Sequence, residues 1–85
     1  MTTFDKLKKA LVYEIEMHKE VNYSSQEDIE IYQRIIYGTY STIHNLCNWN
    51  VIDEDEHKEL LSIVSEYSIM MIGKEFEYAK SKLEE

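Results

Sequence analysis

The chain contains no proline and only two glycines, Gly38 and Gly73, among its 85 residues. Proline and glycine are the residues that most often end helices and form turns, so their scarcity favours long helices. Apolar residues (44%) and charged residues (31%) occur in the proportions of a folded globular protein. We therefore predict an all-α protein with a single helical domain over residues 1–85.

Three capping signals divide the chain into predicted helices at about residues 3–21, 25–48 and 53–83. The signals are Thr2 with Asp5, the capping box Ser24-Ser25-Gln26-Glu27, and Asp53 with Glu56. In such arrangements, side-chain oxygens accept hydrogen bonds from the free backbone N–H groups of the first helical turn. Three helices joined by short connections predict an antiparallel three-helix unit.

The third predicted helix is too long for its domain. At 1.5 Å per residue the stretch from Asp53 to Leu83 spans about 45 Å, whereas a compact chain of this length is roughly 25 Å across. The helix therefore either breaks near Gly73 into a fourth helix or projects past the domain. A projecting helix leaves Phe76, Tyr78, Ala79 and Leu83 uncovered, and we favour a dimeric helical bundle that covers them.

The run Tyr67-Ser68-Ile69-Met70-Met71-Ile72 is apolar on almost every side of this helix. A surface helix needs only one apolar stripe, so we interpret the run as the start of an intermolecular seam. On this interpretation, Met71→Glu dissociates the dimer. The candidate interface comprises Tyr67, Met70, Met71, Ile72, Phe76, Ala79, Leu83 and Trp49. For Trp49, in a predicted turn, we favour a role in covering the bundle end over a role as a binding anchor.

No residue pattern predicts catalysis, a cofactor or a bound metal. His44 and Cys47 share a helix face and could join His57 or His18 in a zinc site, but structural zinc usually takes four ligands with paired spacing. Cys47 is more simply a small buried apolar residue, and His18 a core or interface histidine. We assign no catalytic, cofactor-binding or metal-binding residue. The single cysteine fits a reducing compartment, so we expect a cytoplasmic protein.

The net charge is −8, and residues 53–85 hold ten acidic residues against four lysines. An acidic surface repels nucleic acid, and a single arginine disfavours direct DNA binding by a helix-turn-helix. No apolar run approaches the ~20 residues that span a bilayer, so we expect no membrane partner.

These exclusions favour a small non-catalytic protein that works by protein–protein contact, as a homodimer, a partner-bound regulator or an inhibitor. The alternative is an acidic mimic of nucleic acid that blocks a DNA-binding protein. Residues with GC-rich codons are scarce, which fits a low-GC bacterium, a phage or a mobile element.

Overall fold

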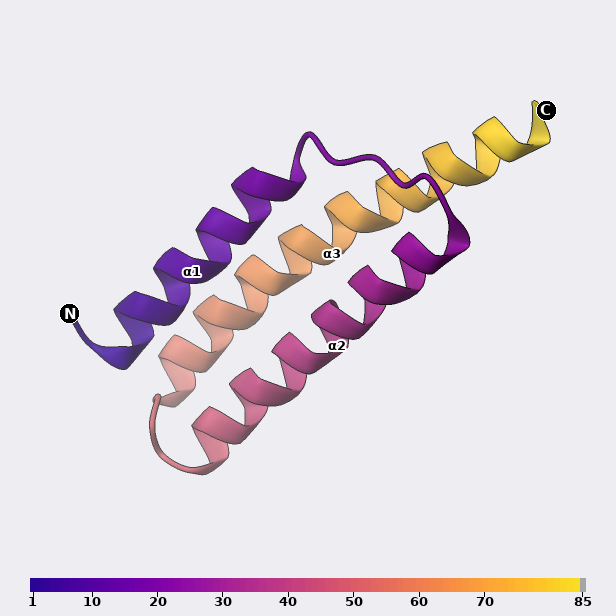
Figure 1. The fold of residues 1–85 in the computed structure, drawn as a ribbon. Helices are drawn as coiled ribbons and strands as arrows, with labels where there is room; N and C mark the ends of the chain where they lie inside the picture. The colour runs from indigo at the N-terminus through magenta and orange to yellow at the C-terminus, as the bar shows by residue number, and fades with distance from the viewer. Residues whose placement is uncertain (85) are drawn as a thin grey trace.

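The structure, a computed structural model, describes residues 1–84, and three helices make up most of that range (Figure 1). They are α1 (Thr3–His18), α2 (Gln26–Asn48) and α3 (Glu54–Leu83). α1 and α3 run in the same direction and α2 runs in the opposite one. The predicted all-α, three-helix fold is confirmed.

The predicted caps of α1 and α3 are present as expected. Thr2 and Asp5 form a capping box, and so do Asp53 and Glu56. In the second of these, the Glu56 N–H donates to Asp53 at 2.8 Å and the Asp53 N–H donates to the Glu56 carboxylate at 3.0 Å. Each box satisfies two backbone donors that the helix itself leaves free.

The cap of α2 lies one residue later than predicted. Ser25 is the capping residue, and its hydroxyl accepts from the Asp28 N–H at 3.2 Å. The Asp28 carboxylate in turn accepts from both the N–H and the hydroxyl of Ser24, at 2.9 and 2.8 Å. These two bonds, from the Ser24 N–H first and the Ser24 hydroxyl second, lower the pKa of Asp28. The box predicted from Ser24 and Glu27 is therefore wrong, because Asp28 holds Ser24 outside the helix.

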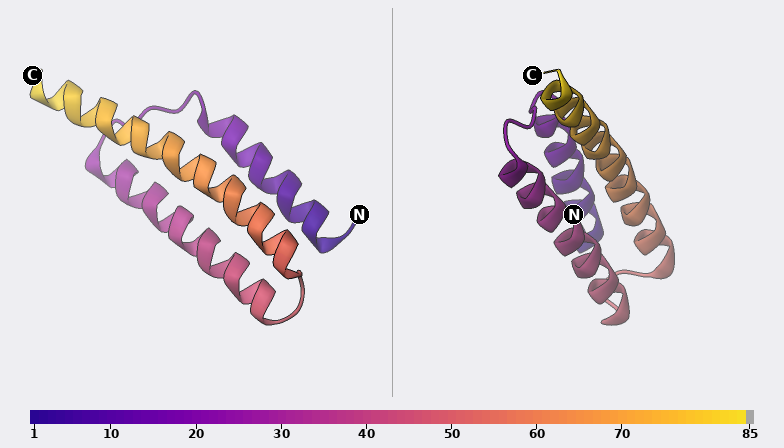
Figure 2. Two further views of the ribbon diagram at one scale, coloured as in Figure 1. Left: turned by 180° about the vertical axis from the view of Figure 1, so that it is seen from behind. Right: turned by 90° about the vertical axis from the view of Figure 1, so that its right-hand side faces the viewer.

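The packing is centred on α3, which both other helices contact. Within the described chain, no Cα atom of α1 lies within 8 Å of one of α2, and α3 lies behind the gap between them (Figures 1 and 2). The buried residues are Tyr23, Ile29, Ile36, Ile43, Ile52, Leu60, Val64, Tyr67 and Met71. Since none of them belongs to α1, that helix contributes only half-buried side chains to the core.

α1 ends at His18, three residues before the predicted end. Lys74 of α3 reaches across, and its ammonium group donates to the carbonyl of Lys19 at 2.9 Å and to that of Val21. The last carbonyls of a helix have no partner within the helix. Lys74 supplies such a partner to the carbonyl of the C-cap residue Lys19, and its second bond ties Val21, in the connection to α2, to α3.

α3 continues as one helix through Gly73, which has no positive φ angle. The last buried residue is Met71, yet the helix runs on to Leu83. Tyr78 is half-buried against the core, so the expectation that it is uncovered is wrong. We name residues 76–83 the α3 extension, and Figures 1 and 2 show it projecting beyond the ends of α1 and α2. The molecule is accordingly elongated, with extents of 50 × 20 × 16 Å.

Candidate interaction surfaces

The candidate interface residues of α3 divide between its two sides. Tyr67 and Met71 lie in the core, 6% and 1% exposed, and Met70 is half-buried. The other members point into solvent: Ile72, Phe76 (71% exposed), Ala79 and Leu83 (89% exposed). The apolar run therefore serves two surfaces, one that packs within the molecule and one that remains uncovered.

This division overturns the expectation that Met71→Glu dissociates an oligomer. Met71 is enclosed by its own chain, so a glutamate there would bury an unpaired charge and unfold the protein. The sequence could not assign Met71 to the inner side, because that depends on where α1 and α2 pack around α3.

The uncovered surface is an outer stripe of Ile69, Ile72, Phe76, Ala79 and Leu83, all of them exposed. Their spacing of three, four, three and four residues is the repeat of a coiled-coil seam. The spacing was present in the sequence, and it would have added Ile69 to the predicted set. Contiguous exposed apolar side chains of this kind mark interaction sites in soluble proteins.

A groove of about 630 Å³ lies beside the outer stripe, between α3 and the first turns of α2. Ile29 and Gln33 of α2 line it together with Ile72, Phe76 and Leu83 of α3. At its edge the Gln33 amide donates to the Glu75 carboxylate at 3.3 Å. Every residue of the outer stripe except Ile69 therefore lines this groove.

A second apolar surface is the α1–α2 cleft, formed because these two helices do not close over α3. It consists of two hollows of about 350 and 320 Å³ that share Leu11, Ile35 and Thr39. Among their lining residues only Glu14 and Arg34 carry a charge. The hydroxyls of Thr39 and Thr42 donate to carbonyls of their own helix, at 2.7 and 2.9 Å, which satisfies their polar groups locally.

Aromatic rings fill the end of the core that lies nearest the α3 extension. The His18 ring packs edge-on against Tyr32 and Tyr67, with centroids 5.0 and 5.7 Å away, and Tyr32 packs against Tyr23. His18 Nδ1 lies 2.7 Å from the Glu14 carbonyl, which can only accept, so this nitrogen carries the proton. His18 therefore has the core role that its position predicted.

Two hydroxyls in this cluster, those of Tyr23 and Tyr67, are buried and have no hydrogen-bond partner among residues 1–84. Burial, with a smaller contribution from nearby charges, raises the pKa of each tyrosine to about 12. Phenols with a pKa this high stay neutral at physiological pH, so we interpret both tyrosines as structural groups.

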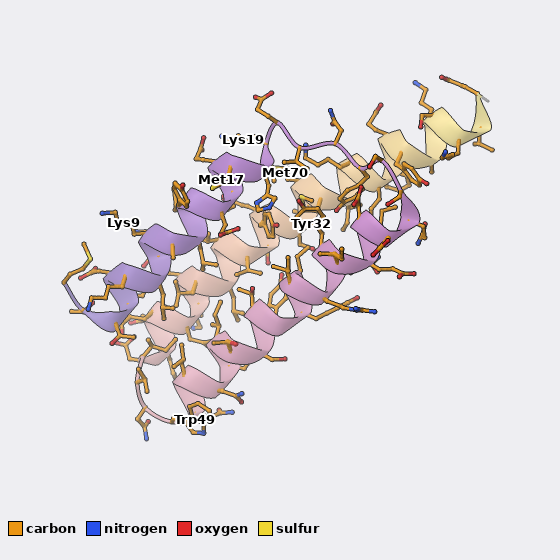
Figure 3. The ribbon with its side chains drawn as sticks, viewed as in Figure 1. Lys9, Met17, Lys19, Tyr32, Trp49 and Met70 are labelled. Carbon is orange, nitrogen blue, oxygen red and sulfur yellow. The ribbon has the colours of Figure 1, made fainter. Side chains whose placement is uncertain are left out.

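Trp49 lies at the opposite end of the molecule from the α3 extension, at the turn between α2 and α3 (Figure 3). It is 68% exposed. Ile52, only 3% exposed, covers that end of the core instead, so the roofing role favoured for Trp49 is wrong. Trp49 remains an exposed aromatic side chain beyond reach of the outer stripe.

His44, near the end of α2, and His57, in the first turn of α3, lie side by side, with Nδ1 of the first 3.0 Å from Nε2 of the second. Their ring centroids are 4.8 Å apart. No third histidine, cysteine or carboxylate among residues 1–84 joins a group that could hold a metal ion. The pair is a hydrogen bond between two helices, with one nitrogen donating and the other accepting.

No protein-family model matches the sequence, and neither a curated protein nor a solved structure gives a significant match. Over residues 1–84, every helix is too short or too polar to cross a membrane.

Proposed function

We propose that this protein is a non-catalytic interaction protein that forms a homodimer through the outer stripe of α3, and that it acts as a regulator or an inhibitor of a protein target. The observation that carries the proposal is the exposure of Phe76 and Leu83 on a helix that outruns its own core. Exposed side chains of this size are costly to leave in water, and covering them on association is favourable by about 25 cal/mol per Å² of buried apolar area.

The α1–α2 cleft supports the second part of the proposal, which concerns the protein target. Charged residues make up 31% of the chain, yet the cleft has two charged side chains, Glu14 on one wall and Arg34 on the other. Depletion of charge at the centre of a surface patch is the compositional mark of a protein interface. With the outer stripe used for dimerisation, the cleft stays open on each protomer. A cytoplasmic location, suggested by the lone Cys47, fits such a regulator.

Sedimentation equilibrium over a range of concentrations tests the self-association. We expect the wild-type protein to shift from monomer to dimer as its concentration rises, and Phe76→Ser to remain monomeric because it removes the largest side chain of the stripe. Tyr13→Ser is the matched control, since Tyr13 is a similarly exposed aromatic residue (62%) on α1. A wild-type protein that stays monomeric at the highest attainable concentration would refute the dimer.

The alternative, an acidic mimic of nucleic acid, predicts a different response to salt. A contact made mainly by carboxylates weakens steeply between low and high ionic strength, whereas an apolar contact changes little. The acids at the start of α3 already have a structural use, because Asp53 and Glu56 cap the helix. We therefore expect target binding to be nearly insensitive to salt.

A further inference from the structure

We propose that the outer stripe pairs with the same stripe of a second copy in an antiparallel orientation, with Ile72 opposite Leu83 of the partner subunit and Phe76 opposite Ala79 of the partner subunit. This inference rests on the proposed homodimer and specifies its geometry. Only residues 72–83 of each α3 overlap in this arrangement, and the two three-helix bodies lie at opposite ends of the dimer.

Side-chain size favours the antiparallel pairing. In a parallel pair each residue of the seam faces its own copy, so the large Phe76 rings would meet in one layer and the small Ala79 side chains would leave a gap in another. In the antiparallel pair a large residue faces a small one in both central layers. Alternation of large and small side chains across facing positions fills the space between two helices without voids.

The residues closer to the body also disfavour a parallel pair. Continuing the same spacing from Ile69 toward the start of α3 gives Ser65, Ser62 and Lys58, which are exposed polar side chains. A parallel dimer would align these positions along the seam, and Lys58 would approach its own copy. Like charges at facing positions destabilise a helix pair, so the apolar contact is confined to the far end of α3.

Charge complementarity supports a second copy as the occupant. Glu75 and Lys82 each directly precede a residue of the stripe, so they lie on the same edge of it. In the antiparallel register this edge of one α3 faces the same edge of the other α3. Glu75 of each protomer then lies close to Lys82 of the other. A parallel pair would instead place Glu75 near Lys80 of the other protomer. The two orientations therefore respond differently to substitutions of these charges.

The groove beside the stripe can accommodate the end of the partner helix. Ile72 and Phe76 line it with Ile29 of α2, and the antiparallel register places the partner's Leu83 against Ile72. Four seam layers make a short contact for a coiled coil, so we expect a dimer that dissociates readily on dilution.

Disulfide trapping tests the orientation. In a Cys47→Ala background, Ile72→Cys and Leu83→Cys are prepared separately and incubated alone or mixed in a glutathione redox buffer. We expect a mixed disulfide to dominate the mixture and little self-crosslinking of either variant, since the register holds identical positions far apart. Efficient self-crosslinking of Leu83→Cys would instead demonstrate a parallel pair and overturn the proposal.

Exchanging the charges of Glu75 and Lys82 tests the orientation independently, because it leaves the apolar stripe intact. We expect Glu75→Lys to weaken dimerisation by about tenfold, because each of two attractive pairs becomes repulsive, and Lys82→Glu added to it to restore the affinity. In a parallel pair the second substitution would give no rescue, since the lysine introduced by Glu75→Lys would still face Lys80. If the protein dimerises but shows neither the mixed disulfide nor the rescue, the antiparallel register is wrong while the homodimer stands. If the wild type is strictly monomeric, the homodimer itself is wrong.

Discussion

At the scale of single residues, the buried hydroxyl of Tyr67 costs stability that a phenylalanine would not. It lies in the core without a partner among the described residues, although its ring packs well against His18. An unsatisfied buried polar group costs about 1–3 kcal/mol. We therefore expect Tyr67→Phe to raise the free energy of unfolding at pH 7 by roughly 1 kcal/mol, measured by urea denaturation.

The same residue makes stability depend on alkaline pH. The pKa of Tyr67 is about 12 in the folded protein and about 10 in the unfolded chain. Between these values the unfolded chain loses its proton first, so stability falls as the pH rises from 10 to 12, and Tyr67→Phe should lessen that fall. Tyr40→Phe is the control, because the Tyr40 hydroxyl bonds to Ser65 at 3.1 Å; an equal gain from both changes would contradict the argument.

At the scale of the helices, Lys74 ties the segment that follows α1 to α3. Its ammonium group serves the carbonyls of Lys19 and Val21, and Lys74→Met would keep the aliphatic stem while removing both hydrogen bonds. We expect a loss of about 2 kcal/mol in the free energy of unfolding, measured by urea denaturation. Lys58→Met, at an exposed position of the same helix, should change stability by less than about 0.5 kcal/mol.

Features that depend on residues close together in the sequence were predicted correctly, and features that depend on distant residues were not. The starts of α1 and α3 were predicted because a cap and its partner lie three residues apart. The end of α1 was missed, and the contacts that Lys74 makes just beyond it come from more than fifty residues away. For the same reason the sequence identified an apolar run in α3 but could not divide it into an inner side with Met71 and an outer side with Phe76.

At the scale of the whole molecule, α3 has its last buried residue at Met71 but continues to Leu83, which makes folding and association separable. A ligand that binds only the folded state raises its apparent stability with concentration, and a second copy is such a ligand. We therefore expect the melting temperature of the wild-type protein to rise with protein concentration. Phe76→Ser should remove this dependence while keeping the melting temperature of the dilute wild-type protein.

Met71→Ala provides the opposite pattern and completes the test. Met71 lies in the core of each protomer, so its truncation should lower the melting temperature at every concentration, at a cost of about 2–5 kcal/mol, and leave the slope against concentration unchanged. Thermal unfolding followed by circular dichroism across a hundredfold range of concentration measures both quantities. If Phe76→Ser lowered the melting temperature of dilute protein as much as Met71→Ala, the α3 extension would belong to the core of a single chain, because only then would Phe76 contribute to the stability of the monomer.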